Sequence, residues 1–477
     1  MRIATYFRPV DTDTLSRLHE ATLKVLSDTG IVFQSDECLD ILKKHGAKID
    51  GQIAFLPDQM VDDAVKSAPS DFKWEARNPD RSIDLGINQT GIHVSSNNGP
   101  IYIQDIDHGR RLGTMEDLIN LYKLAQHSST CSINGQIPVE PSDVTHPLRY
   151  LDIFHQLLKH SDKPLFGYVG DCEEIGRMFD MVRISLGADL ADDSVFDSHR
   201  IGVSLNPLSP LQFDRIPCES LLAYAKLRQP VLVLTCAMAG VTGPVDPMGT
   251  VVLQNAEILA GLTLAQLISP GTPVVYSPAS AVPNMRSAAY VTGSPVSNLI
   301  NMTGIQLARE LYEIPSRCMA GLTDAKVPDC QAGYETMQTY MMLAMAGVNM
   351  VNECYGVLDA IMTVSYEKFI MDDEIMSRAA CAMAGIDMME PGFSTEIIKE
   401  IGHGGSYLMH PSTMAHCRKF WTPEISTMDS YETWESKGSR DTAQAANTRF
   451  KEILAECPDR IIDPEIDQAL EAYIRKI

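Results

Sequence analysis

Histidine is missing from the middle of this 477-residue chain, where none occurs between His199 and His403. Barrel hydrolases that use a metal ion draw histidine ligands from several strands, so this gap argues against a zinc or two-metal hydrolase. The sequence also has no glycine-rich phosphate loop, no Gly-x-Ser-x-Gly turn and no dinucleotide fingerprint after its first predicted strand. We therefore expect neither a bound metal ion nor a bound nucleotide.

Paired cysteines and long apolar runs are absent as well. The 11 cysteines are scattered singly, without a Cys-x-x-Cys pair, which is typical of reduced thiols in a cytoplasmic protein. The segment Met1–Pro9 has no apolar core of a signal peptide. No stretch approaches the roughly 18 apolar residues that cross a bilayer. These absences predict a cytoplasmic protein that does not enter a membrane.

Positive charge is scarce. The chain has 39 Lys and Arg residues against 62 Asp and Glu residues, which gives a formal net charge of -23. Such a surface repels nucleic acid and anionic lipid, so neither is expected as a partner. A solvated acidic surface is the simplest interpretation, and a cationic substrate or a basic partner is the alternative. The charge leaves the oligomeric state open, a homo-oligomer included.

Apolar runs and amphipathic stretches alternate from residue 91 onward, which is typical of βα units. Eight strands are expected at 91–97, 131–137, 164–169, 200–205, 230–236, 273–277, 315–320 and 348–354. Helices are expected at 115–127, 147–160, 173–187, 214–228, 249–268, 295–312, 331–346 and after 365. Eight evenly spaced units favour an α/β fold of the (β/α)8 TIM-barrel type, and an open doubly wound sheet is the alternative.

The sequence predicts three regions. Residues 1–90 show helical periodicity at 11–29, 36–46 and 57–67, so they are expected to form a helical N-terminal region. Residues 91–389 are expected to form the barrel. Residues 390–477 contain several prolines and a final helix, and they are expected to form a C-terminal extension packed on the barrel.

Reactive side chains of a barrel lie at the carboxyl ends of its strands. Taken one at a time, polar residues there more often satisfy loop backbone than bind a ligand. The recurrence of amides and phenols at successive ends nevertheless suits an organic cation, which is attracted to carbonyl oxygens and ring faces. The polar residues at the predicted ends are Asn97, Asn98, Asn134, Gln136, Tyr168, Asn206, Cys236, Tyr276, Ser277, Thr323, Asp324, Glu353 and Tyr355.

Three loops carry further candidates. The loop from Ala320 to Tyr334 places Asp324, Lys326 and Asp329 within six residues after a predicted strand, as expected of an active-site loop. His403 lies in the glycine-rich run 402–410, which is interpreted as either a structural lid or a binding turn. Arg286 follows the sixth strand and is a candidate partner for a substrate carboxylate, with a solvated surface Arg as the alternative.

Five runs resemble the trimethylamine methyltransferase family across nearly the whole chain. In the founding members of that family, pyrrolysine precedes the sequence Ser-Asp-Ala-Lys-Val-Pro-Asp, and aligning this run puts Leu322 at the pyrrolysine position. The chain therefore resembles the branch that lacks this residue. The runs are Ala21–Val32, Val251–Leu267, Thr292–Pro295, Asp324–Gly333 and Gly356–Asp373.

The resemblance implies a (β/α)8 enzyme that moves a methyl group from a quaternary amine to the cob(I)alamin of a cognate corrinoid protein. Glycine betaine is the first choice of substrate, and proline betaine or carnitine is the alternative within the same chemistry. A non-catalytic betaine-binding sensor is an alternative of another class.

The residue roles expected for this chemistry fall into two groups. The catalytic candidates are Glu353, Asp324 and Gln136. The substrate-binding candidates are Asn98, Tyr168, Asn206, Tyr276, Arg286, Leu322, Tyr355 and His403.

Overall fold

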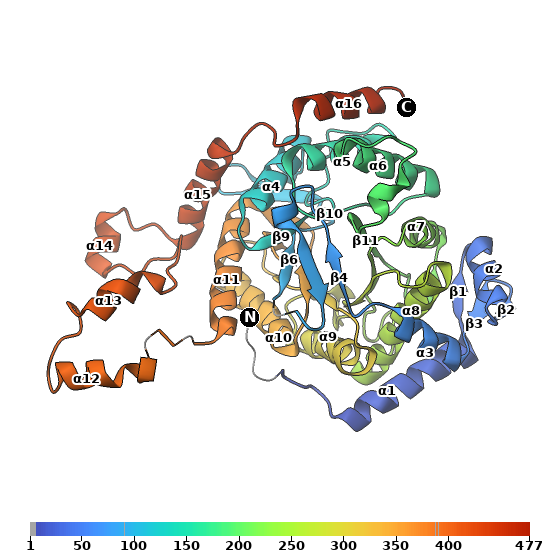
Figure 1. The fold of residues 1–477 in the computed structure, drawn as a ribbon, viewed down its shortest axis with the longest axis horizontal. Helices are drawn as coiled ribbons and strands as arrows, with labels where there is room; N and C mark the ends of the chain where they lie inside the picture. Colours follow the sequence, from blue (N-terminus) through green and yellow to red (C-terminus); the bar gives the residue numbers. More distant parts are fainter. Residues whose placement is uncertain (1–5, 90, 387, 390) are drawn as a thin grey trace.

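The computed structural model describes residues 6–89, 91–386, 388–389 and 391–477. Its centre is an eight-stranded parallel sheet in the order β14-β13-β11-β10-β9-β6-β18-β17 (Figure 1). The backbone N–H of Tyr276 donates to Pro315 O at 2.9 Å, which joins the two outer strands and brings the sheet close to full closure. The strands are β6 (His93–Ser95), β9 (Cys131–Gly135), β10 (Leu165–Phe166), β11 (Ile201–Leu205), β13 (Val231–Thr235), β14 (Val274–Pro278), β17 (Arg317–Met319) and β18 (Met350–Asn352).

A helix follows each strand and covers the outside of the barrel (Figure 1). Capping residues fix where several of these helices begin: Asp171 accepts hydrogen bonds from the first turn of α6, and Asp246 does the same for α8. All eight strands lie where the sequence predicted them, so the (β/α)8 prediction is confirmed over the open-sheet alternative. The helices are α4 (Met115–His127), α5 (Arg149–His160), α6 (Cys172–Ser185), α7 (Arg215–Lys226), α8 (Pro247–Ile268), α9 (Pro295–Leu307), α10 (Cys330–Ala346) and α11 (Tyr366–Ala384).

Helix α8 is apolar on all sides because it is a core helix. Among the described residues it alone is long and apolar enough to cross a membrane, so the prediction that no stretch approaches that length was wrong. It is a core helix, with 83% of its most apolar window buried inside this fold.

A hairpin closes the amino-terminal end of the barrel. Strands β4 (Asp71–Trp74) and β5 (Ile83–Gly86) pair antiparallel and insert their apolar side chains into the barrel interior. Glycine is required at position 202 of β11 because the Trp74 ring lies against it. A Cβ atom there would lie 2.4 Å from the ring. The buried residues that meet in this layer are Phe72, Trp74, Ile83, Leu85, Ile133, Phe166, Leu232, Val275 and Met350.

The N-terminal region contains strands as well as the expected helices. The strands were not predicted because segments of three or four residues give no clear alternation of apolar and polar positions. The helices are α1 (Thr12–Lys24), α2 (Asp36–Lys44) and α3 (Asp58–Ser67), and the strands other than β4 and β5 are β1 (Ile31–Phe33), β2 (Lys48–Asp50) and β3 (Ile53–Phe55). Strand β1 also pairs with β12 (Gln212–Phe213) from the barrel loops.

Short strands from the loops after β6, β14 and β18 lie at the opposite, carboxyl end of the barrel. Four of them form a small sheet in the order β19-β20-β7-β8, and two form a hairpin. Because these loops follow barrel strands, they surround the end where a barrel binds its ligand. The strands are β7 (Tyr102–Asp105), β8 (Gly109–Leu112), β15 (Pro283–Asn284), β16 (Ala289–Tyr290), β19 (Val357–Leu358) and β20 (Thr363–Ser365).

The C-terminal region divides into two parts. Helices α15 (Thr442–Glu456) and α16 (Pro464–Ile474) contribute buried residues and lie against the barrel helices. Helices α12 (Thr395–Ile401), α13 (Pro411–His416) and α14 (Tyr431–Ser436) contain no buried residue and project away from the barrel (Figure 1). Of the predicted C-terminal extension, α15 and α16 thus pack on the barrel, whereas α12, α13 and α14 lie away from it.

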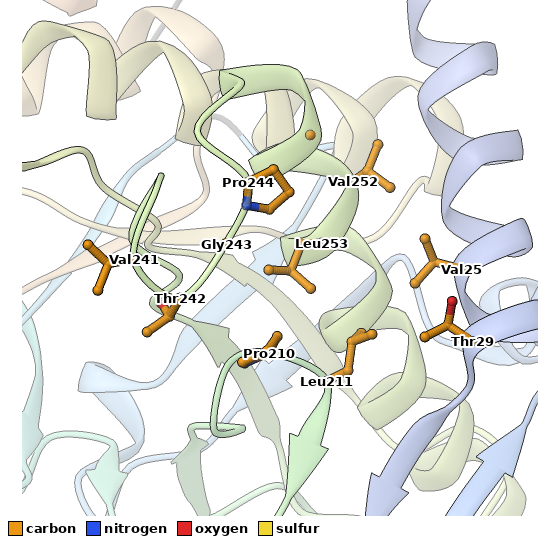
Figure 2. A pocket seen from close by; sticks show the side chains of 11 residues that line it. Val25, Thr29, Pro210, Leu211, Val241, Thr242, Gly243, Pro244, Val252 and Leu253 are labelled. Carbon is orange, nitrogen blue, oxygen red and sulfur yellow. The ribbon is translucent and has the colours of Figure 1, made fainter.

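A groove of about 580 Å³ lies at the rim of the barrel, between the helical turn Val25–Thr29 that follows α1 and the start of α8 (Figure 2). Its lining side chains are apolar or neutral, so it offers no charged partner to a small ionic ligand. They are Val25, Thr29, Pro210, Leu211, Val241, Thr242, Gly243, Pro244, Gly249, Val252 and Leu253.

Candidate active site

A cavity of about 430 Å³ opens at the carboxyl ends of the barrel strands. This volume lies within the roughly 300–1,000 Å³ of small-molecule sites. Asn98, Val169 and Asn206 form its exposed rim, whereas Gln136 and the charged residues below lie at its buried base. The lining residues are Asn98, Gln136, Val169, Ser204, Asn206, Pro217, Leu234, Cys236, Tyr290, Arg317, Met319, Glu353, Ala360 and Ile361.

Glu353 is the carboxylate of this cavity and follows directly after β18. It is 4% exposed. Its Oε2 atom accepts a hydrogen bond from the Asn98 backbone N–H at 2.8 Å, and its Oε1 atom accepts one from Asn352 Nδ2 at 3.1 Å. Burial raises the pKa of Glu353 to about 7, although the Asn98 hydrogen bond and the charge of Arg317 act in the other direction. The carboxyl group therefore changes its charge near neutral pH.

Arg317 is the cation of the cavity and is the first residue of β17. It is 1% exposed, and its Nε and Nη1 atoms have no hydrogen-bond partner within the protein. Burial lowers its pKa from the usual value, and the charge of Glu353 is the main opposing influence. A buried guanidinium with unsatisfied donors is costly unless a ligand completes its hydrogen bonds. Its planar donors match a carboxylate.

Backbone strain coincides with the buried base. Gln136 has a φ of 55° and Glu353 a φ of 62°, which are left-handed values uncommon for residues other than glycine. Such conformations cost on the order of 1–3 kcal/mol and collect at functional sites. Tyr122 helps to hold the first of them, because its hydroxyl donates to Gln136 O at 2.6 Å. The side-chain oxygen of Gln136 has no partner within the protein and is free to meet a ligand.

A buried ion pair fixes the loops that follow β17 and β18. Lys368 Nζ lies 2.6 Å from Asp372 Oδ2 and donates to Gly321 O at 3.2 Å. The same Asp372 oxygen accepts the Gly356 N–H at 2.7 Å. Burial raises the pKa of Asp372 to about 6, against the effect of Lys368. Helix α11 thereby holds both strands that carry Arg317 and Glu353.

Four of the predicted site residues come together in the cavity: Asn98, Gln136, Asn206 and Glu353. The other seven lie outside its lining. Tyr168 borders a neighbouring pocket of about 100 Å³, where its buried hydroxyl has no partner. Tyr276 faces the helices, and its hydroxyl donates to Asn255 Oδ1 at 2.9 Å. Tyr355 stacks on Phe369 in the same outer layer.

The candidate residues in the loops also lie outside the cavity lining. Asp324 accepts hydrogen bonds from the backbone N–H groups of Thr292 and Gly293, at 3.1 and 3.0 Å, so it organises the start of α9. Leu322 is buried in the loop after β17, and Met319 of that strand lines the cavity instead. Arg286 is exposed in the β15–β16 hairpin, and His403 is exposed next to α12.

Arg317, Met319, Tyr290 and the pair Ala360–Ile361 are cavity residues that the sequence prediction did not include. A signal for Arg317 exists in the sequence, because a charged residue inside a barrel strand must face the interior or a partner. The ion pairs near the mouth link Lys326 and Arg110 to Asp359, at 2.8 and 3.4 Å. Lys326 thus supports the segment that holds Ala360 and Ile361.

No group of three or more His, Cys, Asp or Glu side chains that would hold a metal ion occurs among residues 6–89, 91–386, 388–389 and 391–477. Cys236 lines the cavity as a single thiol, and burial raises its pKa to about 12. The polar groups of the site are thus one carboxylate, one guanidinium, one thiol, the hydroxyls of Ser204 and Tyr290, and several amides.

The chain is similar to curated proteins along almost its full length. It is 38% identical over 463 residues to a glycine betaine methyltransferase of Desulfitobacterium hafniense, covering 97% of this chain and 95% of the relative. It is 29% identical to a proline betaine:corrinoid methyltransferase of Eubacterium limosum, covering 88% and 87%. A trimethylamine methyltransferase of Methanosarcina barkeri is 29% identical, covering 98% and 94%.

The fold is similar to that of the monomethylamine methyltransferase of Methanosarcina barkeri, with a TM-score of 0.58, 11% identity and coverage of 97% of this chain and 91% of that one. The family model described as trimethylamine methyltransferase matches residues 1–477. The chain belongs to the trimethylamine methyltransferase family.

Proposed function

We propose that this chain transfers a methyl group from glycine betaine to the cob(I)alamin of a corrinoid protein and releases dimethylglycine. One observation carries the proposal: a guanidinium with unsatisfied donors and a carboxylate lie in one buried cavity at the ligand-binding end of the barrel. Glycine betaine has the complementary pair of charges, a carboxylate and a trimethylammonium group. The 38% identity to a glycine betaine methyltransferase supports the same substrate.

Arg317 binds the substrate carboxylate in this account. Its Nε and Nη1 donors have no partner within the protein, so the substrate carboxylate can complete a charge-assisted hydrogen bond with the guanidinium. The trimethylammonium group then lies toward Glu353 and the free side-chain oxygen of Gln136. A nearby positive charge favours the ionised form of Glu353, so binding lowers its pKa from the value of about 7. The two ends of the zwitterion thus fix its direction in the cavity.

The reaction needs no general acid. Cob(I)alamin donates an electron pair to the methyl carbon, the C–N bond breaks, and its electrons remain on nitrogen as a neutral amine. The protein contributes by holding the C–N bond in line with the incoming cobalt and by excluding water. Positive charge leaves the nitrogen during transfer, so a carboxylate that binds it very tightly favours the substrate over the transition state. Neutral amide oxygens such as that of Gln136 limit this effect.

The corrinoid reaches the substrate through the rim of Asn98, Val169 and Asn206. Its carrier protein docks on this face in our proposal. We also propose that the reaction takes place in the cytoplasm. The relative from Eubacterium limosum is named for a corrinoid acceptor, which supports this part. Proline betaine and carnitine present the same charges on larger frames and are the alternative substrates. Asp324 and Leu322 act in this proposal through loop structure and not through contact with substrate.

The test is formation of methylcobalamin. Purified protein is incubated with cob(I)alamin and, in separate reactions, with glycine betaine, proline betaine, carnitine or trimethylamine. We expect glycine betaine to give the highest kcat/KM and trimethylamine to give the lowest. Turnover of trimethylamine equal to that of glycine betaine would contradict the proposed substrate. Tight betaine binding without any methylcobalamin would favour the non-catalytic sensor.

A further inference from the structure

A segment near the C-terminus, residues 392–420, exposes seven large apolar side chains to solvent. We call it the arm. No residue of the arm is buried. Soluble proteins rarely expose large contiguous apolar patches without a partner to cover them. The exposed large apolar side chains of the arm are Phe393, Ile398, Tyr407, Leu408, Met409, Met414 and Phe420.

The helices of the arm lack the packing that normally stabilises a helix. Helix α12 has seven residues and α13 has six, and neither contains a buried residue. Isolated helices shorter than about 12–15 residues are marginal in water, so short helices depend on tertiary contacts. Within the described residues, the side chains of these helices are at most half-buried, so the helices lack full burial. A surface from another molecule would provide it.

The base of the arm is firmly attached, so the arm is held out from the barrel (Figure 1). Glu374 of α11 accepts the backbone N–H groups of Glu424, Ile425 and Ser426, at 2.7 to 3.2 Å. The indole N–H of Trp421 donates to Ser377 Oγ at 3.0 Å, next to these contacts. Fixing one end in this way lowers the entropy that the arm loses when it binds.

The charge of the arm is opposite to that of the whole chain. The arm has two acidic residues, Glu396 and Glu400, and three basic ones, Lys399, Arg418 and Lys419. With histidine neutral, its net charge is +1, whereas the chain carries -23. A second copy therefore presents an acidic surface that attracts the arm, although two copies otherwise repel each other.

We infer that the arm packs on a second copy of this chain and forms a permanent homo-oligomer. At roughly 60–120 Å² of apolar surface per large side chain, one arm exposes roughly 400–800 Å², which approaches the roughly 800 Å² that each partner buries in a stable interface. Permanent interfaces are also more apolar than transient ones. A corrinoid protein has to leave after each methyl transfer, so it needs a transient and more polar contact; this comparison rests on the proposed function.

Sedimentation velocity of the full chain over a concentration series tests the inference. We expect a species of at least twice the monomer mass of 52.6 kDa. Leu408→Asp should weaken association at least tenfold. The matched control is Leu190→Asp, another exposed leucine outside the arm, which should leave association unchanged. Replacing Arg418 and Lys419 by Glu should weaken association most strongly at low salt.

Three outcomes would overturn the inference: a wild-type monomer at every concentration, a Leu408→Asp variant that associates like the wild type, or equal loss in both leucine variants. A wild-type monomer that binds the corrinoid protein through Leu408 would assign the arm to that protein instead. Methyl transfer to free cob(I)alamin is measured on the same samples. If that activity is absent while the oligomer responds as expected, the proposed function fails and the inference about the arm stands.

Discussion

The barrel cavity and the arm each contain side chains in an unfavourable environment, but of opposite kinds. The cavity keeps a guanidinium and a carboxylate away from water, while the arm keeps leucine, methionine and phenylalanine side chains in water. Each arrangement is unfavourable for the isolated chain. The comparison shows that the unpaired groups of each region indicate the partner that would cover them. The buried charges of the cavity indicate a small zwitterion, and the exposed apolar side chains of the arm indicate a protein surface. We therefore expect substitutions in the cavity to leave association unchanged and substitutions in the arm to leave catalysis unchanged.

The largest expected effect follows from removing the buried cation. Arg317→Ala should lower kcat/KM for glycine betaine by about 100–1,000-fold, because truncating one member of a buried charge pair costs about 2–5 kcal/mol. Arg317→Lys should recover part of the loss, since it keeps the charge but not the planar set of donors. Arg286→Ala serves as the control and should behave like the wild type. A large effect of Arg286→Ala together with a small effect of Arg317→Ala would assign the carboxylate to the exposed arginine.

The next effect concerns Glu353 and pH. Because burial raises its pKa to about 7, the free enzyme should gain its carboxylate charge as pH rises through 7. We therefore expect kcat/KM for glycine betaine to rise over that range, and Glu353→Gln to remove the rise and lower the plateau about 10–100-fold. A pH–rate profile of both proteins is the measurement, and an unchanged profile in the variant would contradict the role.

The same shift predicts an effect on stability. The folded-state pKa of Glu353 lies above its unfolded value of 4.5, so folded protein holds this proton more tightly. The stabilisation is fully present below pH 4.5 and is lost as pH rises toward 7. Glu353→Gln should flatten this part of the stability curve, as measured by urea unfolding at several pH values. A slope equal to that of the wild type would show that Glu353 does not titrate in this range.

A smaller effect is expected from relieving strain at the cavity base. Gln136→Gly removes the side chain from a left-handed residue, where glycine is conformationally favoured. The thermal midpoint should not fall, whereas kcat/KM should fall about tenfold through loss of the ion–dipole contact between the amide oxygen and the trimethylammonium group. Thermal unfolding and methyl transfer are measured on the same preparation. A lower midpoint with unchanged activity would make Gln136 a structural residue.

The last prediction is that a substitution in the arm has no effect on catalysis. Leu408→Asp in the arm should leave kcat/KM with free cob(I)alamin within about twofold of the wild type, because surface substitutions away from a site are usually close to neutral. A larger loss would mean that the arm and the cavity are coupled, and the comparison between them would fail.

The sequence predicted the barrel because its periodic signal is repeated eight times. Gln136 and Glu353 were found for the same reason, since both directly follow buried strands. The direction of each side chain was harder to predict. Val275 faces the barrel interior, so its neighbour Tyr276 must face the helices. An error of one residue in the predicted strand end therefore moves a candidate side chain from the cavity to the outer layer.

Arg317 was missed because the prediction searched only the last residues of each strand. Strand β17 has three residues, and Arg317 and Met319 both face the cavity while Cys318 faces outward. Asp324 was placed in the site because a charged loop residue resembles a catalytic one. Its hydrogen bonds to Thr292 and Gly293 involve residues more than 30 positions away, which a single sequence does not reveal.

The most direct test of the central claim compares two ligands on two proteins by isothermal titration calorimetry. Glycine betaine has both charges, whereas tetramethylammonium has only the cation. We predict that Arg317→Ala weakens glycine betaine at least 50-fold and changes tetramethylammonium affinity at least tenfold less, because only the first ligand contacts the guanidinium, whereas the second is affected only through Glu353. Equal weakening of both ligands, or no weakening of either, would contradict the assignment of Arg317 to the substrate carboxylate.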